Sequence, residues 1–407
     1  MTTVSEVTVE AMRAARRRSI VLRHVEHIRN ATTDFHPDGA RIIPAGEHLD
    51  PEVLAAEREL LRTVPLVAAH SSQLSGPGAY RAEELLDVPI MLVRQKDGTV
   101  RAFLNSCSHR SARLVEGEGK VESRISCPYH AWSYGLAGEL VAITEQAKFG
   151  DIDRSCLSLV SLPCAERYGL IFVILDPRKT MDIDEFLGDF APQLQMAGLD
   201  AFAVSRVRHL PHDVNWKLAL CGYLESYHVR VVHAKTLASS FIGNISTHDA
   251  FGPDAQHFLT TWPMSHVADV AKAPDVEVAI EALPHTPANM VLYLWPNTII
   301  TVPDFIGISH LLRITPGARP GEQLTDFRIL LPKESTPDEL AQIKAFDDLT
   351  VLALEEEDYG QVIGIQKALN SGLRTRTVIG ANEPSLTEMH RNLARAVGRA
   401  QPDLPAT

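Results

Sequence analysis

Short apolar runs separated by turn residues dominate the chain between Pro65 and Pro177. Residues 89–94 and 99–104 are two such runs, and Asp97-Gly98 lies between them. An Asp-Gly pair between two apolar runs is typical of a β-hairpin. Residues 169–175 form a further apolar run, which predicts a buried strand. The pattern therefore predicts an all-β block in this part of the chain.

The pattern changes after Asp182, where helical and extended segments are mixed. Residues 215–238 have helical spacing. Thr336, followed three residues later by Glu339, predicts the N-terminus of a helix. This helix and a second one that follows it are predicted to reach about Gly372. The segments that we predict as strands are residues 288–300, 307–315 and 325–331.

Composition and charge narrow the possible classes of protein. The 407 residues are 45% hydrophobic and 22% charged, as in ordinary globular proteins. A net charge of −12 disfavours nucleic acid as a partner. No apolar run is long enough to span a bilayer, so no membrane association is expected. Five irregularly spaced cysteines do not form a disulfide framework, which indicates a cytoplasmic protein.

The N-terminus lacks the order of charged, apolar and small residues that marks a signal peptide. The segment 13–29 is basic, but Glu6, Glu10 and Glu26 argue against a transit peptide. We expect a surface helix there.

Two loops combine cysteine with histidine. Cys107-Ser-His109 is followed, after a gap of 17 residues, by Cys127-Pro-Tyr-His130. Two thiolates and two imidazoles can bind zinc, although zinc fingers usually place both cysteines in one loop. One cysteine and one histidine in each loop suits a [2Fe–2S] cluster in which one iron binds both thiolates and the other both imidazoles. Histidine ligation raises the reduction potential of such a cluster.

A second group of candidate ligands lies in the C-terminal half. His228 and His233 follow Glu225, and the acidic run 355–358 ends in Asp358. Two histidines and one carboxylate form the facial triad of non-haem Fe(II) enzymes. On a regular helix the two histidines would point about 140° apart, so we expect the helix to be bulged, broken or ended there. By itself this spacing is a weak signal, and the acids 355–357 are interpreted as a solvated helix face.

Taken together, these motifs resemble the catalytic alpha subunits of the Rieske non-haem iron oxygenases, the family that includes the aromatic-ring-hydroxylating dioxygenases. The resemblance covers roughly residues 60–375. Beside the cluster loops, the residues that support the resemblance are Arg110, Trp132, Tyr134, Gly135 and Gly138. In the C-terminal half, the supporting motif is Asn215-Trp-Lys followed by Glu225-x-Tyr-His228-x₄-His233.

The resemblance implies a role for each candidate residue. Cys107, His109, Cys127 and His130 would bind the [2Fe–2S] cluster, and His228, His233 and Asp358 the mononuclear Fe(II). Glu225 stands where the family most often has aspartate, and would connect His130 of a neighbouring subunit with His228 in electron transfer. Many relatives have an acid-Asn-aromatic triplet where this chain has Leu220-Cys221-Gly222. We interpret Cys221 as a small buried residue and not as a ligand.

The resemblance also implies an architecture. The fold is expected to be α+β, with an all-β Rieske domain inserted in a helix-grip (START-like) catalytic domain that has an antiparallel sheet. The expected segments are an N-terminal helix and arm packing on the catalytic domain (1–45), the Rieske domain (46–180), the catalytic iron domain (181–400) and a disordered tail (401–407).

The activity implied is hydroxylation, cis-dihydroxylation or demethylation of a small, aromatic molecule by O₂. Glutamate at position 225 resembles the branch that oxidises quaternary ammonium compounds, which is the alternative substrate class. Electrons would come from a ferredoxin or a flavin reductase, and NAD(P)H would act only through that reductase, because no dinucleotide-binding motif is present. A homotrimer of this chain is expected. The sequence leaves open whether a small beta subunit joins the trimer.

Two rival hypotheses belong to other classes of protein: an electron carrier with a Rieske cluster and no oxygenase activity, and a non-catalytic relative whose iron site has decayed. For the substrate pocket, the candidate wall residues are Phe241, Phe258, Trp262, Tyr293, Trp295, Asn297 and Phe305.

Overall fold

The computed structural model describes residues 6–302 and 307–406, which form two compact units. The larger unit consists of Met1–Arg58, Leu187–Gly198 and Ser205–Thr407. The smaller unit consists of Glu59–Phe186 and Leu199–Val204. The smaller unit is thus inserted in the sequence of the larger one, in agreement with the predicted α+β architecture. The predicted limits of the inserted domain, residues 46 and 180, differ from those of this unit, because the chain up to Arg58 belongs to the larger unit.

The inserted unit is built from short strands in three small sheets, so the prediction of an all-β block is confirmed. The strand orders are β10-β5-β4-β3-β6, β11-β12-β2 and β7-β8-β9. The bounds are Leu66–His70 (β2), Ala79–Leu85 (β3), Val88–Arg94 (β4), Val100–Leu104 (β5), Glu118–Lys120 (β6), Arg124–Ser126 (β7), Ser133–Gly135 (β8), Leu140–Ala142 (β9), Ser161–Leu162 (β10), Cys164–Arg167 (β11) and Leu170–Val173 (β12).

The predicted Asp-Gly hairpin joins β4 to β5. The two strands pair antiparallel, and the Gln95 N–H donates to the Thr99 carbonyl at 2.8 Å to close the turn. Gly98 has φ +87°, a backbone conformation that glycine adopts without steric cost. All four residues of β12 are buried, as expected for a continuous apolar run.

The larger unit contains a seven-stranded antiparallel sheet with the order β13-β19-β18-β17-β16-β15-β14. The predicted strands 288–300, 307–315 and 325–331 correspond to β16 to β19, and residues 288–300 form two strands instead of one. The bounds are Phe202–His212 (β13), Thr247–Phe251 (β14), His257–Pro263 (β15), Ala288–Leu294 (β16), Thr298–Thr301 (β17), Ser309–Pro316 (β18) and Gln323–Pro332 (β19).

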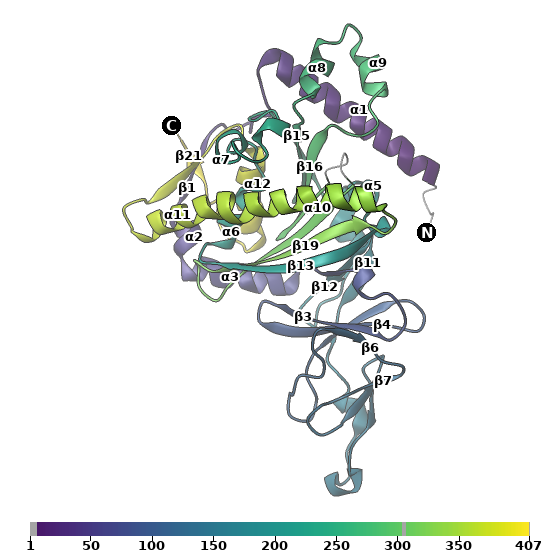
Figure 1. Cartoon of the computed structure of the whole chain (residues 1–407). Helices are drawn as coiled ribbons and strands as arrows, with labels where there is room; N and C mark the ends of the chain where they lie inside the picture. Colours follow the sequence, from purple (N-terminus) through teal and green to yellow (C-terminus); the bar gives the residue numbers. More distant parts are fainter. Residues whose placement is uncertain (1–5, 303–306, 407) are drawn as a thin grey trace. The chain divides into compact units, whose positions relative to one another are not determined.

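A long helix crosses this sheet (Figure 1). Its first part, α10 (Pro337–Leu352), begins at the predicted capping box, in which the Thr336 hydroxyl accepts from the Glu339 N–H and the Glu339 carboxylate accepts from the Thr336 N–H. A π-helical segment, Ala353–Asp358, separates it from α11 (Tyr359–Asn370). The wider turn of the π-helix changes the direction of the side chains that follow α10.

The helical spacing of residues 215–238 does not produce one continuous helix. The structure has α6 (Trp216–Cys221) and the four-residue helix α7 (Val229–Val232), with turns and bends at 222–228. The expectation that a regular helix could not contain both histidines is therefore correct. The chain leaves α6 at Gly222, and its new direction determines where Glu225 and His228 lie.

The Asn215-Trp-Lys motif fixes the start of α6 through a buried polar network. The Asn215 side chain accepts from the Lys217 N–H as an N-cap and donates to the carbonyls of His48 and Pro320. The Trp216 indole N–H donates to Glu57 Oε2 at 2.9 Å. Lys217, with a side chain 1% exposed, pairs with Glu57 and lies 3.5 Å from Glu47.

The two ends of the chain meet in a small sheet of the larger unit. Arg41–Pro44 (β1) lies between Arg376–Ile379 (β20) and Leu404–Pro405 (β21). The tail that was expected to be disordered is instead held in part, because the buried Asp403 carboxylate receives hydrogen bonds from Arg41 and Arg391. The composition of the last seven residues gave no indication of this ion pair.

The remaining helices are short, apart from α1, α3 and α12. Their bounds are Glu6–Asn30 (α1), Gly46–Leu49 (α2), Pro51–Thr63 (α3), Ile183–Leu187 (α4), Ala191–Ala197 (α5), Val267–Lys272 (α8), Val276–Glu281 (α9) and Pro384–Ala396 (α12). The expected N-terminal helix is α1, which packs its buried Val21 and Val25 against α8 and α9. Among the described residues, no helix has both the length and the apolarity to cross a bilayer.

We predict that Lys217→Met lowers the free energy of unfolding by about 3–5 kcal/mol, because Glu47 and Glu57 would keep buried charges without their amine partner. Urea unfolding followed by circular dichroism measures the change. Lys272→Met is the matched control, since that side chain is 78% exposed in its pair with Asp269. It should alter stability by less than about 0.5 kcal/mol. Equal effects of the two substitutions would contradict the role given to the buried pair.

Candidate active site

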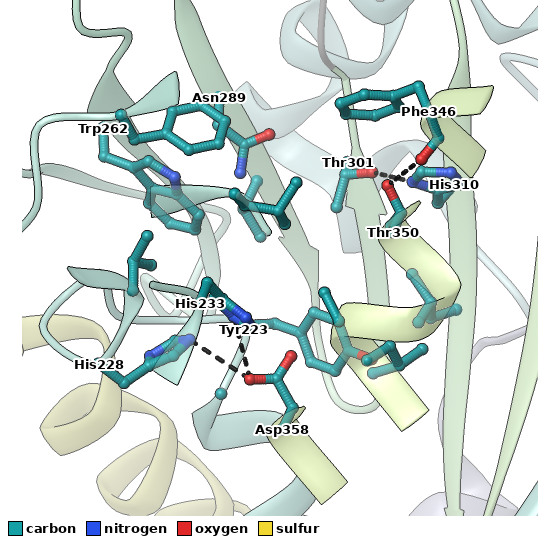
Figure 2. Close-up of a pocket in the computed structure, with 18 of the residues that line it drawn as sticks. Tyr223, His228, His233, Trp262, Asn289, Thr301, His310, Phe346, Thr350 and Asp358 are labelled. Atoms are coloured by element: carbon teal, nitrogen blue, oxygen red, sulfur yellow. Dashed lines mark hydrogen bonds and ion pairs between the residues drawn. The ribbon is translucent and has the colours of Figure 1, made fainter. Parts of the chain in front are cut away.

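The larger unit brings two histidines and one aspartate together at one point. The Oδ1 atom of Asp358 lies 3.2 Å from Nε2 of His233 and 3.6 Å from Nε2 of His228. One potential ligand atom from each of the three residues lies within 4.8 Å of the other two. Figure 2 shows the two imidazoles and the carboxylate converging at one end of a cavity.

This donor set fits a mononuclear iron ion. Metal–ligand bonds of about 2.1 Å at right angles place neighbouring ligand atoms roughly 3 Å apart, close to the 3.2 Å and 3.6 Å between Asp358 and the two imidazoles. Two neutral imidazoles and one carboxylate on the same side of an ion form the facial arrangement that non-haem Fe(II) enzymes use. The remaining positions around the ion would be open to other molecules.

Two irregular helices give the triad its geometry. His228 is the N-cap and His233 the C-cap of α7, so only one helical turn separates the imidazoles. Asp358 is the last residue of the π-helical segment. π-turns inside longer helices occur frequently at functional sites, because they redirect single side chains. Neither irregularity follows from the hydrophobic pattern.

A second carboxylate orients each imidazole. Glu357 Oε2 lies 2.7 Å from Nδ1 of His233 and also accepts from the Thr236 hydroxyl at 2.6 Å. Glu225 is hydrogen-bonded to Nδ1 of His228. A histidine ligand commonly donates its second N–H to a carboxylate, which fixes the ring and increases the basicity of the other nitrogen. In both rings Nε2 is thus left to face Asp358.

The charge of the site favours a bound cation. Burial lowers the pKa of His233, but the carboxylates of Asp358 and Glu357 raise it, and the net change is a rise. At His228, the effect of burial is likewise exceeded by Glu225 and Asp358, with a net rise of the pKa. Without an ion, the carboxylates stabilise the protonated imidazolium forms.

Glu357 was assigned from the sequence to a solvated helix face, and the structure corrects this interpretation. Of the three acids before Asp358, Glu356 is exposed and Glu355 pairs with Arg208 at 3.1 Å. Glu357 is half-buried and contacts His233. The position of the acid beside Asp358 was the one available signal, but α-helical geometry would have turned its side chain about 100° away from that of Asp358.

The triad opens into a cavity of about 120 Å³. The wall is mostly apolar and comes from the sheet, α7 and α10, with Leu237, Phe241, Trp262, Val291, Leu312, Phe327, Phe346 and Leu354 among the lining residues. Polar groups are few: Tyr223 lines the cavity together with the triad, and Asn289, Thr301, His310 and Thr350 lie on the wall away from the triad (Figure 2). A cavity of this kind accepts a small, largely apolar molecule.

Two of the predicted wall residues, Phe241 and Trp262, line this cavity. Phe258, Tyr293, Trp295 and Asn297 are buried but are not among its described lining residues, and Phe305 lies outside the described residues. The register of the sheet explains the difference, because Trp262 pairs with Asn289 at the cavity whereas Phe258 pairs with Tyr293 farther along the two strands. Asn289 and His310 were not anticipated.

Cys221 is not part of the triad. Burial raises the pKa of its thiol to about 12, so the group stays protonated near neutral pH. It lines a second cavity, of about 150 Å³, which also borders His228 and Asp358. Cys221 is half-buried, so its interpretation as a small residue outside the ligand set stays a prediction, and its burial is only partial.

In the inserted unit, the two Cys/His loops share one backbone pattern. In the first, the Ser111 N–H donates to the Cys107 carbonyl and the Cys107 N–H donates to Ala112. In the second, Ala131 donates to Cys127 and Cys127 donates to Trp132 in the same way. Ser111 and Ala131 both have positive φ, at 57° and 60°. Each loop therefore presents its cysteine and its histidine from a similar tight turn.

The side chains of these loops form two layers. Cys107 and Cys127 are buried with Trp132 and Tyr134 in an apolar cluster, and the Tyr134 hydroxyl lies 3.2 Å from the Cys107 sulfur. His109 and His130 are half-buried, with their Nδ1 atoms 3.1 Å apart. Buried thiols and imidazoles that meet nearer the surface fit a [2Fe–2S] cluster with one thiolate-bound and one histidine-bound iron.

Aromatic rings hold the two imidazoles. The Trp132 ring stacks on His109 with centroids 4.8 Å apart, and Tyr129 stacks on His130 at 3.8 Å. Tyr129 is 61% exposed, so the His130 side of the pair lies at the surface of this unit. An electron donor or acceptor could approach the imidazoles from that side.

Comparisons with known proteins agree with both sites. The family model "Ring hydroxylating alpha subunit (catalytic domain)" matches residues 199–399, and "Rieske [2Fe-2S] domain" matches residues 64–163. The carnitine monooxygenase oxygenase subunit of Escherichia coli strain K12 is 27% identical over 376 residues, covering 88% of this chain and 95% of that protein.

Two further comparisons extend the range of relatives. The anthranilate 1,2-dioxygenase large subunit of Acinetobacter baylyi is 30% identical over 209 residues, which cover 49% of this chain and 44% of that protein. A solved structure of the quaternary ammonium Rieske monooxygenase CntA superposes with a TM-score of 0.75 at 24% identity, covering 88% of this chain and 96% of that one. The last comparison concerns the fold alone.

We predict that Asp358→Ala abolishes binding of the mononuclear iron, whereas Glu357→Gln weakens it by roughly 10–100-fold, as expected for a residue that orients a ligand. Back-titration of metal-depleted protein with Fe(II) measures this binding. Both variants should keep the [2Fe–2S] cluster. Before Fe(II) is added back, each should therefore contain about two irons and two acid-labile sulfides per chain.

Glu356→Gln is the matched control, because this neighbouring acid is exposed and should leave iron binding unchanged. Equal iron affinity in Glu357→Gln and Glu356→Gln would show that Glu357 does not support His233.

Proposed function

The chain belongs to the Rieske non-haem iron oxygenases as a catalytic alpha subunit, and we propose that it inserts oxygen from O₂ into a small, largely apolar organic molecule. The protein is an oxidoreductase with a Rieske [2Fe–2S] domain and a mononuclear iron domain. Its reaction would be hydroxylation, cis-dihydroxylation or oxidative demethylation.

The observation that carries this proposal is the opening of the His228–His233–Asp358 triad into an apolar cavity. An electron carrier with only a Rieske cluster has no use for such a cavity. A relative with a decayed iron site would not be expected to retain all three ligands together with Glu225 and Glu357, the residues that orient two of them.

The proposed roles of the residues follow from their contacts. Cys107, Cys127, His109 and His130 would hold the cluster, and His228, His233 and Asp358 the iron. When bound, the iron would supply O₂ activation and the cluster would store one electron. Glu225 and Glu357 would keep the two imidazoles oriented, and the apolar lining of the cavity would keep water away from the reacting substrate.

Electrons must reach this protein from a partner. The sequence contains no dinucleotide-binding motif, so NAD(P)H would act through a separate reductase or ferredoxin. Such a donor would have to approach the cluster closely, from a side of the inserted unit other than the Tyr129 loop.

We further propose that electrons pass between neighbouring copies of the chain, in a homotrimer. In the larger unit, exposed apolar side chains surround the loop that contains Glu225, with Phe35 60%, Tyr227 62% and Val378 66% exposed. They line a surface hollow with Glu383. The exposed Tyr129 loop of a second copy would bury this apolar surface and bring its His130 to Glu225.

Oxidation of a quaternary ammonium compound is the second candidate function. The Escherichia coli relative named above is a carnitine monooxygenase subunit, and glutamate at position 225 resembles that branch. Aromatic side chains such as Trp262 and Phe241 could contact a quaternary ammonium group through cation–π interactions.

We predict that chemically reduced, iron-loaded protein incorporates ¹⁸O from ¹⁸O₂ into at least one compound of a panel of indane, 1-indanone, benzoate, choline and L-carnitine. Mass spectrometry of the products distinguishes one incorporated oxygen atom from two. Asp358→Ala should yield no labelled product, because the iron would be lost while the cluster remains. Labelled product at an undiminished rate from this variant would refute the proposed iron site.

We predict that two inactive variants complement each other when they are co-expressed. His109→Ala would lack a working cluster and Asp358→Ala would lack the mononuclear iron. Mixed trimers should recover about a quarter of the wild-type activity, since one in four neighbouring pairs combines an intact cluster with an intact iron site.

Adding Glu225→Gln to the iron-competent variant should lower the recovered activity by roughly 10–100-fold, and Glu225→Asp by less. No recovery at all would indicate transfer within one chain and would contradict the proposed assembly.

A further inference from the structure

One amide side chain on the cavity wall has no hydrogen-bond partner. Asn289 lies on β16, opposite Trp262 of β15, and lines the cavity. No hydrogen bond joins its side chain to another described residue, although it is half-buried. In Figure 2 the amide points from the wall into the cavity, on the side away from Asp358. Polar groups in such positions usually have a partner, so the amide is available to a ligand.

The described wall of the cavity has no oppositely charged side chain for a charged ligand beyond the iron site. Its described lining residues include no lysine or arginine, and Asp358 is the one acid among them. His310 is uncharged near neutral pH, because burial lowers its pKa to about 4. Its Nδ1 lies 3.0 Å from the Thr301 hydroxyl, and its Nε2 lies 3.8 Å from the buried Asp347. The wall is therefore polar at a few points but electrically neutral.

Such a wall distinguishes sharply between classes of ligand. A carboxylate or ammonium group moved from water into an apolar cavity without a counter-charge loses several kcal/mol of hydration. A carbonyl or hydroxyl group loses much less and recovers it in one hydrogen bond. An asparagine amide can serve either group, because it offers both a donor and an acceptor.

We propose that the substrate is an uncharged, largely apolar molecule with one carbonyl or hydroxyl group, which Asn289 binds at the end of the cavity away from the iron. This inference rests on the proposed oxygenase function and specifies its substrate class. The proposed substrate class differs from that of enzymes that act on zwitterions such as carnitine or glycine betaine. The carboxylate of a zwitterion would meet no lysine or arginine on the described wall of this cavity. Asn289 is a specificity-determining residue that positions the carbon to be oxidised and takes no part in the oxidation.

Binding, measured apart from turnover, tests the proposal. Equilibrium dialysis of the iron-loaded protein without O₂ compares indane with 1-indanone, which share a skeleton and differ in one carbonyl group. Asn289→Leu should shift the ratio of the two dissociation constants by roughly 3–10-fold against 1-indanone, since one hydrogen bond is lost. Benzoate, choline and L-carnitine should bind the wild-type protein more than about 100-fold more weakly than 1-indanone.

Two controls distinguish the loss of one hydrogen bond from a general effect of the substitution on the protein. Asn30→Leu, at an exposed asparagine outside the cavity, should leave the ratio unchanged. Unchanged binding of indane by Asn289→Leu would show that the cavity of the variant is intact. If the variant does not fold, the relative affinities of the wild-type protein for neutral and charged probes test the proposed substrate class. An unchanged ratio in folded Asn289→Leu, or tighter binding of any charged probe than of 1-indanone, overturns the proposal. Failure of the oxygenase function itself would appear separately, as the absence of any oxidised product from every compound of the panel.

Discussion

One imidazole is held from both sides by two consecutive acids, and the geometry around the triad depends on this contact. Glu357 meets Nδ1 of His233, and Asp358 faces Nε2 of the same ring. The two acids stand at the end of the π-helical segment Ala353–Asp358 and reach opposite nitrogens of the ring. The helix that follows is fixed in turn, because the Tyr359 hydroxyl is hydrogen-bonded to Thr325 of β19 at 2.5 Å.

The other half of the triad depends on a buried network at some distance from it. Asn215, Trp216 and Lys217 fix the start of α6 through partners on α2 and α3, so the exit of the chain at Gly222 is fixed as well. That exit leads directly to Glu225 and His228. The family motif Asn-Trp-Lys thus acts on the site through the backbone, since none of its three side chains lines the cavity. Burying a lysine between two glutamates is costly, and the geometry that results is specific.

Features encoded by local sequence could be predicted, and those that depend on distant contacts could not. The Asp97-Gly98 turn and the capping box of Thr336 are determined within a few residues, and the structure has both. The two cluster loops were recognisable because each has its cysteine and its histidine within four residues. The role of Glu357 depends on its contact with His233, 124 positions away in the sequence, which no hydrophobic periodicity records. Asn289 gave no signal because an isolated asparagine in an apolar strand has many possible explanations. The pairing of Asp403 with Arg41 joins residues from opposite ends of the chain.

The single amide on the cavity wall also bears on stereochemistry. One hydrogen bond fixes the distance between the polar end of a molecule and the iron, but it leaves rotation about the long axis of the molecule free. Which of two mirror-related faces turns toward the triad is then decided by the shape of the wall, in which Trp262 pairs with Asn289 on the neighbouring strand. If Asn289 holds the polar end, regiochemistry and enantioselectivity depend on different side chains of the same wall.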